Sequence, residues 1–416
     1  MRIGFLVAWV LCAAVVGAED EIAQVFVPHY FCTEGVCRTR ADNIPQAHIA
    51  DMGDEYFTGY IQALVDMNYY EFEVRTIVRG GVVFVFNLPN NALIANSILC
   101  FIYDIPCVNC IQRVNCCPDD FIAALEAYDP AAAQDIALSD AYLGMCKTQA
   151  DRCSIRGIWL PQNTVLFPPL IADPRQVTNG AALRFNDNVI GKHVGAVSFG
   201  DDFIFLRLKD LLYWHGDMDL GIEAGIFAVF DLDHPKACMF NTDFYVAALM
   251  SYAFDRWAFR FRLWHMSSHI GDEFLIANPG FDRRNLSDEG IDSFVSCQLG
   301  QAVRLYGGLG YIFDRDKEFP EHPFYFEWGA EIRAFGGKDC FNRLYVQPFL
   351  AMHFRSWEEH GYDLDQTYAL GVEWSKIQGV GRRFRFFGEY HNGFSKEGQF
   401  CRQRVDYVAI KVTYGF

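Results

Sequence analysis

The segment that begins at His265 reads His-Met-Ser-Ser-His and contains the residue types of a nucleophilic hydrolase. In such a site a histidine acts as general base, a serine acts as nucleophile, and a third group orients the histidine. His265 and Ser267 are the candidate pair. The sequence offers Asp272, Glu273 and Glu289 as the orienting group without choosing between them, and Glu273 is our working assignment.

The residues before this pair predict a β-strand with one apolar face. Apolar side chains at every second position from 257 to 263 alternate with a face that carries Arg260 and Arg262. Continuing the period of two places His265, Ser267 and His269 on the apolar side, which in a membrane barrel faces lipid.

A less specific interpretation is favoured over catalysis for the same residues. A β-bulge near Trp264 would turn His265 inward. It would then join a buried hydrogen-bonded network with Arg260, Arg262, Asp272 and Glu273 that anchors the following loop. The wider set that we expect in the lumen or in this network is Arg260, Arg262, Ser268, His269, Asp272, Arg304, Glu389 and His391.

The last eleven residues form an alternating strand that ends the chain on Phe416. Their length matches the roughly 9–11 residues that a tilted strand needs to cross a bilayer. This pattern resembles the C-terminal strand of outer-membrane β-barrels, which implies recognition by the barrel assembly machinery. With Phe416 on the periplasmic side, the long connections lie outside the cell and His265 lies near the outer leaflet.

The alternation continues back along the chain and predicts a mostly β protein. We expect an antiparallel transmembrane β-barrel of about 12 strands, preceded by a small α+β periplasmic domain. The expected strands are 194–199, 203–208, 222–230, 244–254, 257–267, 292–299, 303–313, 324–335, 344–354, 367–374, 383–392 and 407–416. Inward charges of both signs would either line a narrow selective channel or close it by ion pairing.

The chain divides into four parts by composition. Residues 1–18 have the pattern of a secretory signal peptide, 19–155 form a cysteine-rich α+β domain, 156–193 a linker or barrel entry, and 194–416 the barrel. Between 55 and 114 we expect the order helix, strand, strand, helix, strand. The pattern Val-x-x-Ile-Val-x-Gly-Gly-Val-Val from Val74 resembles a BON domain, a periplasmic module associated with membranes and pores.

Charge and cysteine content limit the partners. A formal net charge of −17 argues against nucleic acid. Nine of the thirteen cysteines after residue 18 precede residue 155, and in an exported protein they predict disulfides, with an odd thiol available to another envelope protein. We expect no metal site and no cofactor, and outer-membrane lipid as a partner.

Four motifs resemble an uncharacterised bacterial envelope family catalogued as domain of unknown function 1207. They begin at Phe167 (Phe-Pro-Pro-Leu-Ile-Ala-Asp-Pro-Arg), at Arg260 (Arg-x-Arg-x-x-His-x-Ser-Ser-His-Ile-Gly-Asp-Glu), at Arg304 (Arg-Leu-Tyr-Gly-Gly-Leu-Gly-Tyr) and at Glu389 (Glu-Tyr-His-Asn-Gly). The resemblance implies an outer-membrane barrel without an assigned activity.

His265-x-Ser267 is also similar to the His-x-Ser pair of the outer-membrane lipid A deacylase and phospholipase A families. Those families continue with Asn and then Gly or Ala, whereas Ser268 and His269 follow here. We therefore expect a structural or lipid- or solute-handling envelope protein. A lipid esterase and a narrow channel are the alternatives.

Overall fold

The computed structural model describes residues 53–79, 82–105, 108, 110–114, 156–161, 164–234, 237–284, 286–300, 302–317, 319–334, 337–338, 345–375 and 381–416. The expected signal peptide lies outside the described residues. So do eight of the nine cysteine side chains before residue 155, and the predicted disulfides among them remain a prediction.

The N-terminal domain has the expected order of elements. Its described elements are the helix α4 (Asp54–Tyr69), the 3-10 turn η1 (Tyr70–Phe72), the strands β1 (Arg75–Arg79) and β2 (Val82–Phe86), the helix α5 (Ala92–Asp104) and the strand β3 (Cys110–Arg113). β2 pairs antiparallel with β1 and parallel with β3. The Asn91 side chain caps α5 by accepting from the Ile94 backbone N–H at 3.0 Å. No comparison tests the relationship to BON domains.

Twelve antiparallel strands form a closed barrel, as predicted, because β17 pairs back onto β5. They are β5 (Asn179–Asp187), β6 (Gly191–Leu211), β7 (Gly216–Asp231), β8 (Cys238–Phe254), β9 (Trp257–Ile270), β10 (Leu286–Leu299), β11 (Val303–Asp314), β12 (Phe324–Arg333), β14 (Tyr345–Trp357), β15 (Leu364–Ser375), β16 (Arg383–Phe394) and β17 (Arg404–Gly415). Two short strands, β4 (Arg156–Trp159) and β13 (Gly337–Lys338), pair at the edges of β6 and β14.

The number of strands agrees with the expectation, but their membership differs at the start of the barrel. The segments 194–199 and 203–208 are parts of one strand, β6, which is 21 residues long. The polar residues Asp201 and Asp202 between them continue the ladder and pair with β7. The strand that sequence reasoning missed is β5, so the barrel includes residues 179–187, ahead of the expected start at 194.

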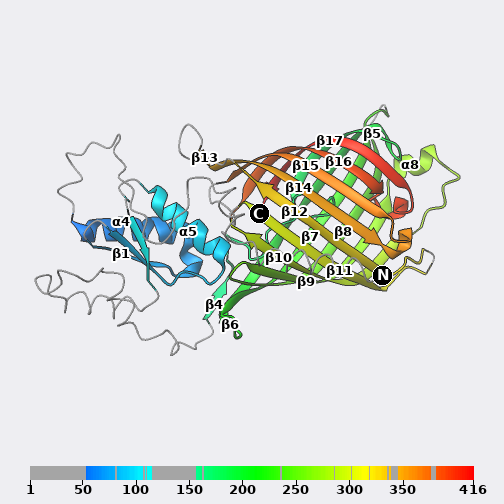
Figure 1. Cartoon of the computed structure of the whole chain (residues 1–416). Coiled ribbons are helices and arrows are strands. Elements are labelled where there is room, and N and C mark those ends of the chain that lie inside the picture. The colour runs from blue at the N-terminus through cyan, green and yellow to red at the C-terminus, as the bar shows by residue number, and fades with distance from the viewer. Residues whose placement is uncertain are drawn as a thin grey trace, which may run out of the picture.

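The strands run between two unlike ends of the barrel (Figure 1). β17 ends beside the N-terminal domain, and at that end tight turns join β8 to β9 and β10 to β11. The opposite end carries the longer connections, including the short helix α8 (Asp272–Ala277) between β9 and β10. The strands from 203–208 onward run relative to one another as expected, whereas 194–199 runs in the same direction as 203–208 because both belong to β6.

The N-terminal domain is attached to the barrel by backbone and side-chain bonds. The N–H of Asp255, in the turn after β8, donates to the Asn90 carbonyl at 2.6 Å, and the Ala92 N–H donates to the Asp255 carbonyl at 2.6 Å. The Asn90 amide donates to the Trp214 carbonyl, also at 2.6 Å. The strand β6 contributes as well, since Lys209 donates to the Phe72 carbonyl at 2.8 Å and Arg207 pairs with Glu71 at 3.4 Å.

The outside of the barrel is apolar and rich in aromatic residues. On β12 the outward set is the one predicted, with Phe324 and Trp328 exposed while Tyr325, Glu331 and Arg333 are buried. On β17 Val408, Ile410 and Tyr414 are exposed, and these positions share the outward face. The described helices include none long and apolar enough to span a membrane. A closed barrel with an apolar exterior and a polar interior is the architecture of an outer-membrane protein.

Candidate functional site

The burial of β9 alternates from Ala258 to Trp264 and again from Ser268 to Ile270, and the unbroken period of two between them gives the direction of the candidate pair. Arg260 and Arg262 are buried inside the barrel, and Ser268 is buried on the same side. His265 and Ser267 lie on the opposite, outward side. The pairing of β9 with β8 and with β10 has no register shift, so the β-bulge expected near Trp264 is not present in β9.

Glu289 on β10, and not Glu273, lies against the histidine. His265 is directly opposite Glu289 in the β9–β10 register, and Glu289 Oε1 is 3.6 Å from His265 Nδ1. Asp272 and Glu273 are exposed residues in the first turn of α8, beyond the end of β9. Among the described residues no hydrogen bond or ion pair joins either of them to His265. The structure therefore places Glu289, and not the working choice Glu273, beside His265, and the expected buried network of His265 with Asp272 and Glu273 is not formed.

Ser287 is a second outward residue that sequence reasoning missed. It is directly opposite Ser267 in the β9–β10 register and is exposed on the same face. Directly opposed residues of antiparallel strands have Cβ atoms about 4.5–5.5 Å apart. The outward face thus has two hydroxyls, an imidazole and a carboxylate on two neighbouring strands. The 271–285 connection hides this register from sequence reasoning, because its length does not determine which residues pair.

The site lies toward the α8 end of the apolar outside wall. His265 follows Trp257, the first residue of β9, by eight positions. At about 3.3 Å per residue and about 45° of tilt this is roughly 19 Å along the barrel axis, most of an apolar band about 25 Å tall. Phe244 is opposite Ser267 on β8 and makes an edge contact with His269 at 5.7 Å between ring centroids. Polar residues are tolerated at this level because it borders the interface.

The expected luminal residues separate into two groups. Arg260, Arg262, Ser268, Arg304, Glu389 and His391 are buried inside the barrel. His269 points outward and Asp272 is exposed in α8. The inward charges close into ion pairs: Arg262 contacts Glu223 and Asp292, both at 2.9 Å. The sequence left open whether the inward charges line a channel or close it by ion pairing, and pairs such as these close it.

Residues 164–178, here called the plug, run through the lumen and fill it. Arg304 donates to the carbonyls of Pro168 and Pro169, at 2.8 and 3.4 Å. The guanidinium groups of Arg304 and Arg260 also lie over the Phe167 ring, at 4.8 and 4.6 Å. Part of the expected linker or barrel entry at 156–193, including Pro168 and Pro169, is therefore a buried segment.

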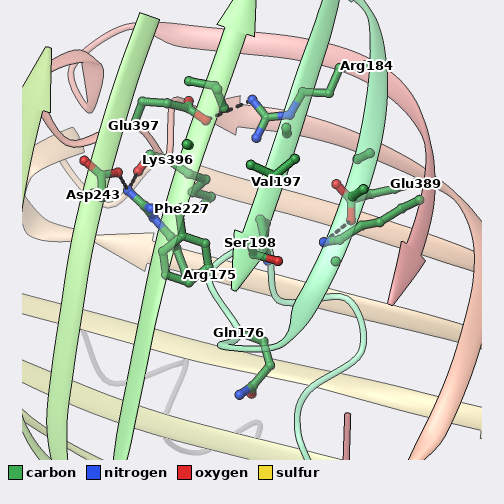
Figure 2. A pocket seen from close by; sticks show the side chains of 18 of the residues that line it. Arg175, Gln176, Arg184, Val197, Ser198, Phe227, Asp243, Glu389, Lys396 and Glu397 are labelled. Atoms are coloured by element: carbon green, nitrogen blue, oxygen red, sulfur yellow. Dashed lines mark hydrogen bonds and ion pairs between the residues drawn. The ribbon is translucent and has the colours of Figure 1, made fainter. Parts of the chain in front are cut away.

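The loop 395–403, which joins β16 to β17, meets the plug inside the barrel (Figure 2). Arg175 of the plug contacts Asp243 and the Lys396 carbonyl, and Glu397 contacts Arg184 at 2.9 Å. Burial raises the pKa of Glu397, but the guanidinium groups of Arg184 and Arg175 outweigh it and hold that pKa at about 2. Glu397 is thus a charged link between this loop and the wall.

A cavity of about 40 Å³ remains between the plug, the loop and the wall. A water needs about 10–15 Å³ of this kind of volume, so the cavity has room for a few water molecules. The polar lining is satisfied by pairs such as Lys411 with Glu389 at 3.2 Å. In the described part of the chain the lumen is therefore closed.

The filled lumen predicts that the native chain conducts no steady ion current in planar bilayers. Replacing residues 165–177 by a Gly/Ser segment of equal length should give stepwise conductance, because the plug contacts of Arg260 and Arg304 are lost. Arg404→Ala, which removes an exposed pair with Asp363 at the outer surface, is the control and should stay silent. Steady conductance of the native chain would contradict the closed lumen.

Comparisons with known proteins place the chain in a family. A family model described as protein of unknown function (DUF1207) matches residues 71–416, and no curated protein sequence matches the chain. The chain is similar to the outer membrane phospholipase A of Escherichia coli, at 11% identity and a TM-score of 0.38, over 57% of this chain and 92% of that chain. The outer membrane phospholipase dimer of Salmonella typhi with bound calcium gives 11% identity and 0.38, over 59% and 93%. A variant of OccD1 (OprD) gives 10% and 0.21, over 53% and 64%. Similarities this low leave the activity to be argued from the site itself.

Proposed function

The chain belongs to this DUF1207 family, and from its own geometry we propose that it is an outer-membrane barrel with a serine-type lipid acyl hydrolase site on its outer face. The observation that carries the proposal is the cross-strand placement of Glu289 against His265. Ser267 is two residues from His265 on the same outward face. This is the nucleophile, base and orienting-carboxylate arrangement of acyl hydrolases.

The reaction follows from the roles of these three groups. His265 accepts the Ser267 hydroxyl proton as the oxygen attacks the carbonyl carbon of a lipid ester, and the alcohol leaves with a proton returned by the imidazole. Water then attacks the acyl-serine with the same base, which releases the fatty acid and restores the serine. Glu289 holds Nδ1 and stabilises the imidazolium. The Ser287 hydroxyl, opposite Ser267, is the candidate donor to the carbonyl oxygen.

The position of the site supports a membrane lipid as substrate. The pair projects outward near the outer edge of the apolar band, where the ester linkages of outer-leaflet lipids lie. A luminal solute has no access, because the wall separates Ser267 from the filled interior. The ester could belong to phospholipid or to lipid A, and both are included in the test.

The test combines covalent labelling with lipid turnover. The full chain in detergent should react with a fluorophosphonate probe, and peptide mapping should find the label on Ser267. Acyl release should be seen from mixed micelles of phospholipid or of lipid A, and the reactive lipid identifies the substrate class. Absence of both labelling and acyl release with either lipid would overturn the proposal.

A second candidate function is that of an envelope protein without catalytic chemistry. In this candidate the barrel anchors the N-terminal domain, and the outward polar residues contact lipid headgroups. The supporting observation is the backbone pairing of Asn90 with the turn at Asp255. This function remains if the folded chain neither labels nor turns over lipid.

We further propose the orientation of the protein in the outer membrane. The N-terminal BON-like domain would lie in the periplasm, delivered there by residues 1–18, and the assembly machinery would bind β17. The long connections at the α8 end support this, since outer-membrane barrels place short turns in the periplasm. An epitope inserted after Ile276, which is 80% exposed, should bind antibody on intact cells. An epitope in α4 should bind only after permeabilisation, and the reverse pattern would contradict the orientation.

A further inference from the structure

We propose that Asp173, Glu327 and His353 form a divalent-metal site inside the barrel that fastens the plug to the wall. The three residues come from the plug, β12 and β14. One ligand atom from each lies within 4.8 Å of the others. The site is on the luminal side of the wall and does not depend on the hydrolase proposal.

The imidazole of His353 is oriented by a hydrogen bond on its other nitrogen. The Tyr306 hydroxyl donates to the Met352 carbonyl at 3.2 Å, so its remaining capacity toward His353 Nδ1, at 3.1 Å, is to accept. In the tautomer in which Nδ1–H donates to this hydroxyl, Nε2 of the neutral ring has the lone pair. A histidine whose second nitrogen is fixed in this way is the usual form of a metal ligand.

Nε2 points at two carboxylates without bonding to either. It is 3.8 Å from Glu327 Oε2 and 4.0 Å from Asp173 Oδ1, and the His353 side chain is only 2% exposed. Both distances are longer than a hydrogen bond. Three electron-pair donors thus converge on one buried point, and a cation satisfies all of them.

The spacing suits a metal ion better than a proton. A proton on Nε2 would leave an N–H too far from either oxygen for a hydrogen bond. Two ligand atoms that bind one ion at about 2.0–2.2 Å lie at most about 4 Å apart. The three side chains would therefore move slightly toward one another to bind an ion in tetrahedral geometry. One nitrogen and two carboxylate oxygens are ligands for zinc or manganese, and calcium would prefer oxygen alone.

The surroundings hold each ligand in place. The other carboxylate oxygen of Glu327, Oε1, lies 3.4 Å from Arg355 Nε, and Oε2 is the oxygen that would bind the ion. Asp173 Oδ1 accepts from the Arg175 backbone N–H at 2.8 Å, which fixes the carboxylate in the turn of the plug. Gly329, opposite His353 in the β12–β14 register, makes room for Tyr306, because a Cβ at this position would lie 2.3 Å from the Tyr306 hydroxyl.

The experiment uses Mn²⁺, because manganese prefers oxygen and nitrogen ligands to the cysteine thiols of this chain. The full chain in detergent is stripped with EDTA, incubated for long periods with Mn²⁺ and measured by electron paramagnetic resonance. We expect one tightly bound ion per chain, and its loss in His353→Gln and in Asp173→Asn. His391→Gln replaces another fully buried luminal histidine and is the matched control that should keep the ion.

A variant that keeps all three ligands protects the test against misfolding. Tyr306→Phe should weaken Mn²⁺ binding by about 10–100-fold, because it removes the group that orients His353. Folding of every variant is checked by the shift of the unheated barrel in gel electrophoresis. If folded native chain binds no more Mn²⁺ than folded His353→Gln or Asp173→Asn, the proposal is overturned and His353 is a buried imidazolium.

Discussion

Ser267→Ala is expected to lower the rate of acyl release by at least about 10³-fold, because nucleophilic catalysis is lost when the nucleophile is removed. Fluorophosphonate labelling should disappear with it. Ser267 projects outward from a regular strand position, so its replacement leaves no internal cavity and the barrel should fold as before. The measurement is kcat/KM for phospholipid and lipid A micelles, with the folded fraction determined by gel shift.

The matched control is Ser293→Ala, which removes another outward serine from the neighbouring strand β10. Ser293 is opposite Phe261, far from His265 along the strand, and its loss should leave turnover unchanged. If Ser267→Ala retains the native rate while the protein is folded, the acyl release comes from another residue or from a contaminant, and the hydrolase proposal fails.

Two glutamate variants distinguish which carboxylate orients His265. Glu289→Gln should lower turnover on the order of 10²-fold, because the His265–Glu289 pair is half exposed and contributes less than a fully buried pair would. Glu273→Gln should have no effect, since Glu273 lies in α8 away from the histidine. A loss of turnover in Glu273→Gln but not in Glu289→Gln would mean that α8 closes over the site in solution.

The outward direction of His265 was predictable because side-chain parity is a local property of a strand. Arg260 and Arg262 define the inner face, and the period of two needs only the next few residues. Glu289 was not predictable, because its register depends on how the 271–285 connection closes. Cross-strand partners separated by a long loop are decided by tertiary pairing and not by sequence spacing.

The plug shows a second limit of sequence reasoning. Its prolines predicted a linker, and they do prevent regular structure there, but the neighbouring residues Val165, Leu166 and Phe167 are all buried. Those apolar residues were the available signal. The missed strand β5 has a weak alternation, because Gly180, Ala181 and Ala182 do not distinguish an inner from an outer face.

The charged side chains that close the lumen are paired in the folded barrel. Removing the partner of such a buried charge costs folding free energy. Glu373 on β15 is 4% exposed and lies between three guanidinium groups. It contacts Arg333 at 2.9 Å, Arg385 at 3.3 Å and Arg383 at 3.5 Å. Glu331 is a second counter-charge for Arg333, at 3.2 Å, and Arg385 also donates to the Phe416 backbone oxygen, at 3.3 Å.

Glu373→Gln is expected to lower the free energy of unfolding by about 3–5 kcal/mol, because it removes the carboxylate that three buried guanidinium groups share. The change keeps the side-chain volume, so the loss reports charge and not packing. It is measured by urea unfolding of the chain folded in lipid vesicles, with equal m-values as the check on the two-state assumption. Asp363→Asn removes the exposed partner of Arg404 and should leave the midpoint unchanged. A loss below about 1 kcal/mol in Glu373→Gln would show that water or ions reach the three arginines, and the interior would then be more open than the plug and the ion pairs imply.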